Sequence, residues 1–409
     1  MSQPPVPDDA DAYESAAARA DADMSVPAPE WSDQGEAAVR VSTVELFFDL
    51  VFVFTITQLT AVLVADTTVV AVVQVLLMLG VIWWMYGGYA WLTNAVVPSN
   101  TMRRGLLVVG MAGFLTMALA IPHAFGATGW AFGIGYFVVN LVHTGLFLLS
   151  AGSGAVRAMR FLGPLNMLTA TLVLVGGFTP TPWRYALWAV ALGVEIATPY
   201  LSPIGGFTVS AGHFVERHGL VIIVALGESV VAIGVGAAGL HLDLGVLAVV
   251  ISGLIVAYFL YWTYFGGDEV RAEHALNSIT DRHRRARVAL QAYGYAHYPM
   301  LAGIVAVAAG VKKAIGHAYG HVSFAQALAL GGGVALFLAG DLVFRRILRI
   351  GRPGYRLLAL AGALASVPLG LVNAAAQVVV LMFVLAVPLS VEGYRQVKAA
   401  GVGRVIWRR

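Results

Sequence analysis

The sequence contains no cysteine among its 409 residues. Disulfide bonds, thiolate nucleophiles and cysteine-ligated metal sites are therefore excluded. Charge is also scarce, because only 11% of the residues are Asp, Glu, Lys or Arg, against about 25% in a soluble domain. The sequence contains no P-loop, no GxSxG nucleophile motif and no HExxH zinc motif, so it offers no signature of a soluble enzyme.

Hydrophobic residues make up 59% of the chain, and this composition predicts a multi-pass membrane protein whose main partner is the lipid bilayer. The basic residues lie between the apolar runs, where membrane topology accounts for them, so we expect no nucleic-acid partner. Residues 1–40 differ from the rest, being rich in Asp, Ala and Pro without a basic and then apolar leader pattern. We expect a disordered acidic tail there and not a signal peptide.

Apolar runs of about 20 residues, long enough to cross a bilayer, predict an all-α fold with about 12 transmembrane helices. The predicted spans are 44–64, 69–91, 105–125, 130–151, 158–177, 183–203, 217–238, 244–265, 287–310, 323–344, 356–373 and 375–393. The last two are short and joined by few residues. An even number of spans puts both termini on one side. Most basic residues, among them Arg217, Arg345 and Arg356, then share that side, and the positive-inside rule predicts that both termini are cytoplasmic.

Several features of the first half of the sequence recur in the second half in the same order. They are a Val-Glu pair opening the first span (Glu45, Glu216), an aromatic and glycine cluster ending the second (from Trp83, from Tyr261), a basic pair before the third (Arg103-Arg104, Arg284-Arg285) and a late carboxylate in the sixth (Glu195, Glu392). We therefore predict two parallel six-helix repeats at 41–206 and 207–395, followed by a basic C-terminal tail at 396–409. Chance recurrence of aromatic belts and basic loops is the alternative.

The first span, VELFFDLVFVFTITQL, carries two carboxylates one helical turn apart, Glu45 and Asp49. The i, i+4 spacing places them on one helix face, and a charge in hydrocarbon costs about 2.5–3.5 kcal/mol on insertion scales. A favourable charge at the helix N-terminus explains Glu45 well and Asp49 poorly. We therefore expect Asp49 to share a proton or to pair with an arginine inside the bundle.

The seventh span carries Glu228 about 17 Å from its start, near the middle of the bilayer. In the predicted repeat, Thr57 and Gln58 occupy nearly the same place in the first span. The residues around Glu228 are apolar or small, which would let a neighbouring helix or water approach. A protonated glutamate that only joins two helices is the structural alternative to a role in an ion or solute pathway.

The same span opens with GHFVERHGL, which contains His213, Glu216 and Arg217. Glu216 and Arg217 are adjacent and cannot pair with each other along a helix. Arg217 is therefore free to reach Asp49 or Glu45 if the two leading helices meet. His213 and His218 are five residues apart and face different ways, so we expect no metal site.

Further polar residues within predicted spans are His143, Glu195 and His297. A haem held by His143 and His297 is one reading, but lone histidines in a bundle are more often hydrogen-bonded interior residues, so we expect no cofactor. The aromatic clusters around Trp83 to Trp91 and Tyr258 to Tyr264 are most simply interfacial belts. A surface for an organic cation is the secondary reading.

The two stretches VELFFDLVFVFTITQL and HFVERHGLVIIVALGES together resemble the bacterial low temperature requirement A family, over roughly 40–395. The family blocks fall on Glu45, Phe48 and Asp49, and on His213, Glu216, Arg217, Gly227 and Glu228. The resemblance implies a protein of the bacterial cytoplasmic (inner) membrane named for a growth phenotype in the cold. It implies no substrate or reaction.

These observations favour a secondary transporter or channel for an unidentified small solute or ion, proton-linked through its carboxylates. The predicted pathway residues are Glu45, Asp49, Gln58, Glu216, Arg217 and Glu228, and we predict no catalytic residues. A membrane-embedded enzyme acting on a lipid or isoprenoid, and a non-transporting scaffold or sensor, are the alternatives. A cavity between the repeats would favour transport, a lateral cleft catalysis and a dry bundle a scaffold. A homodimer is compatible with the sequence.

Overall fold

The computed structural model describes residues 41–95, 101–150, 152–201, 207 and 209–399, and these residues form helices and connections without any strand. The all-α prediction is therefore confirmed. The predicted acidic tail at 1–40 and the end of the predicted basic tail at 400–409 lie outside the described residues. The long helices are α2 (Thr43–Ala65), α3 (Val69–Ala95), α4 (Thr101–Ala120), α5 (Gly129–Ser150), α6 (Ser153–Phe178), α7 (Thr181–Leu201), α8 (Ala211–Ala237), α9 (Leu244–Phe265), α12 (His297–Gly316), α13 (Phe324–Leu348) and α16 (Ala374–Ala399). The shorter ones are α10 (Asp268–Asn277), α11 (Arg282–Ala289), α14 (Gly354–Ala365) and α15 (Val367–Gly370).

Ten helical segments of the described chain are long and apolar enough to cross a membrane. They coincide with ten of the twelve predicted spans. The other two predicted spans are helical but fall short of this standard. Helix α7 is long enough but carries Arg184, Glu195 and Pro199, and the 356–373 span is a short helix, α14, that gives way to α15 at Ser366. Twelve membrane crossings therefore remain a prediction. Ten of the described helices have the length and composition that a crossing requires.

The leading helix α2 begins where the sequence places a serine before a glutamate. The backbone N–H and the hydroxyl of Ser42 both donate to Glu45 Oε2, at 2.7 and 2.8 Å. This local arrangement fixes the first turn, so Glu45 serves the helix N-terminus as expected. Helix α8 begins at Ala211, six residues before the predicted span, and its first turns therefore carry His213 and Arg217 on a continuous helix.

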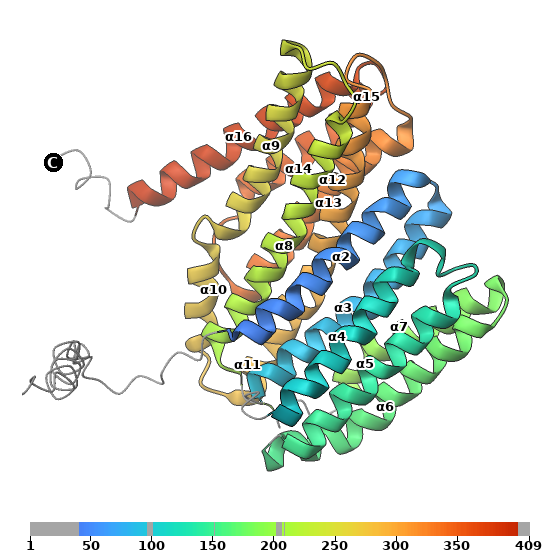
Figure 1. The fold of residues 1–409 in the computed structure, drawn as a ribbon. Coiled ribbons are helices and arrows are strands. Elements are labelled where there is room, and N and C mark those ends of the chain that lie inside the picture. Colours follow the sequence, from blue (N-terminus) through green and yellow to red (C-terminus); the bar gives the residue numbers. More distant parts are fainter. Residues whose placement is uncertain (1–40, 96–100, 151, 202–206, 208, 400–409) are drawn as a thin grey trace, which may run out of the picture. The chain divides into compact units, whose positions relative to one another are not determined.

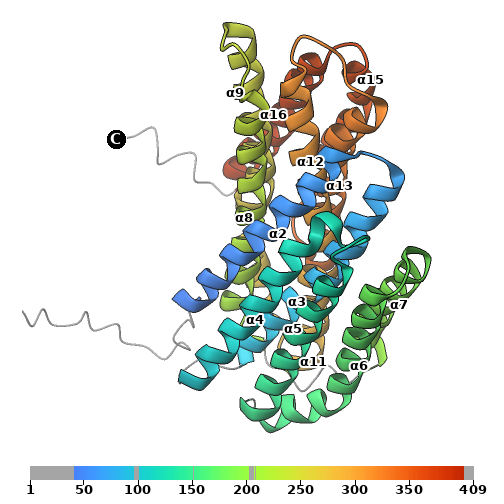
Figure 2. The same cartoon turned by 45° about the vertical axis from the view of Figure 1, so that its right-hand side comes forward.

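Helix α2 packs against α8 on one side and α4 on the other (Figures 1 and 2). Three side-chain contacts join α2 to α8, and their residue numbers rise together along both helices: 45 with 213, 49 with 217 and 57 with 228. The two helices therefore run in the same direction.

Close packing inside each half of the chain depends on glycine. A Cβ atom on Gly303 of α12 would lie 2.7 Å from the carbonyl oxygen of Gly333 on α13. A Cβ atom on Gly135 of α5 would lie 2.6 Å from the carbonyl oxygen of Gly113 on α4. Only glycine lets these backbones approach so closely, as is common between membrane helices.

The helix that leads into α12 changes its winding. Residues Leu290–Tyr295 form a π-helix between α11 and α12. The indole N–H of Trp83 on α3 donates to the carbonyl oxygen of Gly294 within it, at 2.7 Å. Such π-segments are frequently found at functional sites, and this one contacts α3 and α8.

Candidate functional site

A buried polar interface connects α2 and α8. We call it the α2–α8 track and define it by Glu45, Asp49, Thr57, His213, Arg217 and Glu228. Except for the half-buried Thr57, all of these residues are at most 5% exposed. The track has three levels, each joining one residue of α2 to one of α8.

The first level pairs Glu45 with His213. Glu45 Oε1 lies 3.2 Å from His213 Nε2, while the other carboxylate oxygen is occupied by Ser42. Glu45 therefore has two tasks, because it begins α2 and it ties that helix to α8. Oε2 is bonded by Ser42, whereas Oε1 makes no hydrogen bond within the described chain and has only the imidazole of His213 beside it.

The second level is the ion pair of Asp49 and Arg217. Arg217 Nη2 lies 3.3 Å from Asp49 Oδ1, and the hydroxyl of Tyr86 on α3 donates to the same oxygen at 2.9 Å. The guanidinium also lies over the rings of Phe48 and Tyr86, 5.5 and 5.6 Å from their centroids, where the π-electrons favour a cation. The predicted pairing of Arg217 with Asp49 is confirmed.

The ion pair does not satisfy all of its own atoms. Among the described residues, Asp49 Oδ2 and Arg217 Nε and Nη1 have no hydrogen-bond partner. A buried pair gains its stability only when its remaining lone pairs and protons are bonded too. This level is therefore held by a single charged contact, one tyrosine hydroxyl and the two rings, and it can open without breaking a large network.

The third level joins Glu228 to Thr57. The hydroxyl of Thr57 donates to Glu228 Oε2 at 2.5 Å and also lies 3.2 Å from the carbonyl oxygen of Val53. Within the described chain, Glu228 has no ion-pair partner. Thr57 has one hydrogen and two acceptors within reach, so its hydroxyl can accommodate either state of the carboxyl group.

Two of the predicted pathway residues lie apart from the track. Gln58 is half-buried, and the described residues offer its side chain no hydrogen bond. Glu216 is exposed and accepts a hydrogen bond from the backbone N–H of Val41 at 3.4 Å. Gln58 and Glu216 lie away from the α2–α8 contact, because their chain neighbours Thr57 and Arg217 occupy the positions that face it.

The secondary residues are buried but scattered. Glu195 on α7 accepts a hydrogen bond from the hydroxyl of Tyr136, and the described chain supplies no partner for its second oxygen. His297 donates from Nδ1 to the carbonyl oxygen of Ala292 at 2.9 Å and accepts from the Tyr264 hydroxyl at 3.0 Å. His297 is thus a hydrogen-bonded interior residue. His143 lines a cavity that is described below.

The prediction of interfacial belts is wrong for part of the aromatic clusters. Trp83 is 3% exposed, and Tyr86 is fully buried against Asp49 and Arg217. Their rings stack at 5.4 Å and form an inner wall of the track. Tyr258, Tyr261 and Trp262 on α9 remain exposed, as a belt requires.

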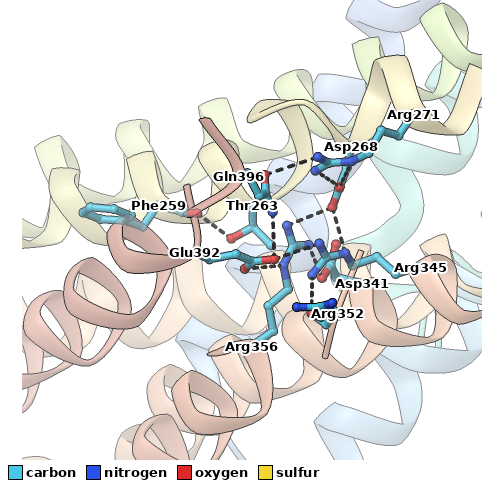
Figure 3. Close-up of polar contacts among 10 residues, drawn as sticks. All are labelled: Phe259, Thr263, Asp268, Arg271, Asp341, Arg345, Arg352, Arg356, Glu392 and Gln396. Atoms are coloured by element: carbon cyan, nitrogen blue, oxygen red, sulfur yellow. Dashed lines mark hydrogen bonds and ion pairs between the residues drawn. The ribbon is translucent and has the colours of Figure 1, made fainter. Parts of the chain in front are cut away.

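A second cluster of charged residues lies outside the predicted site, and we call it the charge network (Figure 3). It comprises three carboxylates and three arginines: Asp268, Asp341, Glu392, Arg271, Arg345 and Arg356. Asp268 Oδ2 lies 3.1 Å from Arg345 Nε and 2.8 Å from Arg356 Nη2. Glu392 bridges the same two arginines, at 2.7 and 3.2 Å.

Arg356 contacts all three carboxylates of the charge network, since it also pairs with Asp341. The network joins α10, α13, α14 and α16, and its formal charges cancel. Arg345 and Arg356 were predicted in cytoplasmic loops, but they are 3% and 4% exposed. The i, i+4 spacing of Asp341 and Arg345 within one apolar helix was the signal available in the sequence.

These features define a class of protein: a multi-pass helical membrane protein with charged pairs buried between its helices. The chain belongs to the family of bacterial low temperature requirement A proteins, which matches residues 40–391. It is 30% identical over 321 residues to an uncharacterized protein of Rhizobium meliloti (strain 1021), covering 75% of this chain and 78% of that protein. No solved structure matches the chain.

Proposed function

We propose that this protein is a proton-linked secondary transporter of the bacterial inner membrane, with the α2–α8 track as its proton pathway. The observation that carries the proposal is the contact of Glu228 with Thr57. When Glu228 is ionised, Thr57 donates its hydrogen to the carboxylate. When Glu228 is protonated, it donates to Thr57, whose hydrogen turns to the carbonyl oxygen of Val53. Glu228 can therefore take up and release a proton without leaving a buried polar atom unbonded.

Asp49 has a different role in this proposal. A proton on Asp49 would take from the buried Arg217 its ion-pair partner within the described chain, which is strongly unfavourable. The Asp49–Arg217 pair therefore acts as a gate between α2 and α8, and Glu228 as the group that titrates. The gate opens when the single charged contact at 3.3 Å is exchanged for another partner.

The predicted internal repeat is part of this proposal, because repeats that move against each other are the common design of secondary transporters. Helix α2 packs on α3 and α4, and α8 packs on α9 and α12. The pairs α4–α5, α5–α6, α6–α7 and α3–α7 correspond in order to α12–α13, α13–α14, α14–α16 and α9–α16. The glycine contacts of α4 with α5 and of α12 with α13 add a further correspondence. The track then lies where the leading helices of the two repeats meet.

The orientation in the membrane is part of the same proposal. The excess of basic residues on one side favours a cytoplasmic location for both termini, and the segment at 1–40 would then be a cytoplasmic tail. A membrane-embedded enzyme acting on a lipid is the second candidate. The observation in its favour is the largely apolar lining of a cavity beside the track, although helices of both halves of the chain line this cavity, which is the position that transport predicts.

The test is flux in proteoliposomes that contain purified protein, with imposed proton, sodium, potassium and chloride gradients applied one at a time. We expect movement of protons or of a coupled ion in wild type and its loss in Asp49→Asn. The substitution Glu216→Gln is the matched control, because Glu216 is an exposed carboxylate on the same helix as Arg217. Folded wild-type protein that moves no ion under any gradient would contradict the proposal.

A further inference from the structure

A cavity of about 120 Å³ lies beside the track. Helices α3, α5, α6 and α7 of the first half line it, together with α8 and the π-helix of the second half. Its wall is rich in aromatic side chains: Trp83, Trp84, Trp91, Phe147 and Phe207. For comparison, an engineered apolar cavity of about 150 Å³ in another protein binds benzene. The space therefore suits a single aromatic ring.

Two histidines give this aromatic cavity a polar side. His143 Nε2 lies 3.1 Å from the carbonyl oxygen of Gly88, and His218 Nδ1 lies 2.8 Å from the carbonyl oxygen of Phe214. A carbonyl oxygen can only accept, so these two nitrogens carry the hydrogens. The remaining nitrogens, His143 Nδ1 and His218 Nε2, are acceptors in the neutral rings.

His143 Nδ1 is buried without a hydrogen-bond partner within the described chain. The ring of His218 uses Nδ1 for its bond to Phe214, which leaves Nε2 as the acceptor open to a ligand in the cavity. His143 is 4% exposed and His218 is 1% exposed, so neither nitrogen can rely on bulk water. The nearby donor of Trp83 is unavailable, because its indole N–H is bonded to Gly294. An acceptor without a donor in such a site is unfavourable. A ligand that brings a hydroxyl or N–H group would supply the missing donor.

The cavity wall contains no Asp, Glu, Lys or Arg. A charged ligand would be desolvated there without a counterion, which is unfavourable. From the ring-sized space, the aromatic wall and the free acceptor nitrogen of His218, we propose that the cavity binds a neutral single-ring aromatic molecule bearing a hydroxyl group, a compound of the phenol class.

The cavity is connected through neighbouring side chains to the Asp49–Arg217 pair. Trp83 lines it and stacks on Tyr86, whose hydroxyl bonds to Asp49. His218 lines it and is adjacent to Arg217 in the chain. A bound ring that shifts Trp83 or His218 therefore changes the surroundings of the Asp49–Arg217 pair. This link makes the phenol-class molecule the transported solute, and that part of the inference rests on the proposed function.

The binding test uses 4-fluorophenol and 4-fluorotoluene, which have nearly the same shape but differ in the hydroxyl donor. Fluorine NMR titrations would be run on the full-length protein in lipid nanodiscs, with empty nanodiscs to subtract partition into lipid. We expect 4-fluorophenol to bind roughly tenfold more tightly, the equivalent of one hydrogen bond. In His218→Phe, which keeps a ring but removes the acceptor, this preference falls toward unity.

A second variant tests the same site independently, in case His218→Phe does not fold. Leu162→Trp on α6 fills the cavity and should abolish binding of both probes. Leu168→Trp on the same helix is the control, because Leu168 is 49% exposed and lies outside the cavity.

Equal binding of the two probes would overturn the inference and leave an apolar pocket, such as one for an acyl chain. Absence of binding to wild type would overturn it as well, whatever the flux measurements show. Selective binding of 4-fluorophenol without any ion flux would instead uphold the binding site and refute transport. The two proposals therefore fail separately.

Discussion

Arg356 is the side chain on which the charge network depends most, because it contacts all three of the carboxylates Asp268, Asp341 and Glu392. The substitution Arg356→Met keeps the length of the side chain and removes the charge. Three carboxylates then face two arginines, so one negative charge is buried without compensation. Breaking a buried pair from one side costs about 3–5 kcal/mol, and we expect the free energy of unfolding to fall by that amount.

The assay is equilibrium unfolding of purified protein in mixed micelles, followed by tryptophan fluorescence. Arg346→Met is the matched control, since Arg346 is the exposed neighbour of Arg345 on the same helix and should change stability by less than about 0.5 kcal/mol. The double variant Arg356→Met/Asp341→Leu restores the charge balance and should recover part of the loss. A single variant as stable as wild type, or a double variant whose losses simply add, would refute the reasoning.

Three further predictions concern the track, a loop and the glycine contacts. Asp49→Asn and Arg217→Gln should each destabilise the protein, and their double variant should cost less than the sum, measured by a double-mutant cycle. Hydrogen bonds from Tyr319 and from the N–H of Val246 lower the pKa of Asp243. The stability that Asp243 contributes is therefore present above its unfolded pKa and is lost as the pH falls through its folded pKa. In Asp243→Asn, the free energy of unfolding should therefore fall less steeply between pH 5 and pH 2, roughly the range in which a carboxyl group titrates. Gly303→Ala should cost about 1–3 kcal/mol by forcing α12 from α13, whereas Gly193→Ala, which meets nothing within 4 Å, should be neutral in the same unfolding assay.

Hydrophobicity made much of the fold predictable, because a span must be apolar for its full length. Two predicted spans fall short of that standard for the same reason, because one is less apolar and the other is shorter than the rest. Helix α7 carries Arg184 and Glu195 and is less apolar than a typical span, although the structure makes it a continuous helix. Helix α14 ends at Ala365, where Ser366 separates it from α15. Local composition gives no measure of how neighbouring helices shelter a short or polar segment.

The candidate site could be predicted where a buried charge requires a partner of opposite charge. Asp49 is too deep in an apolar helix to remain unpaired, and Arg217 has no partner on its own helix, so their contact followed from the two stretches together. Glu228 contacts Thr57 and not Gln58, because neighbouring residues of a helix point about 100° apart around its axis. Which of these two residues faces α8 is fixed by packing between α2 and α8.

Neither the complete charge network nor the cavity could be predicted from the sequence, for a further reason. Asp268, Arg356 and Glu392 lie on three different helices far apart in the chain, and no local pattern shows that their side chains converge. The free acceptors of His143 and His218 depend on which carbonyl oxygen each ring meets. Both features are products of tertiary structure.

The central claim is that Glu228 takes up and releases a proton within the membrane. The most direct measurement is infrared difference spectroscopy of the protein in nanodiscs between alkaline and acidic pH. Wild type minus Glu228→Gln should show one protonated-carboxyl band that wild type gains on acidification, and Thr57→Val should shift this band by removing its hydrogen-bond partner. Identical difference spectra for wild type and Glu228→Gln would contradict the account.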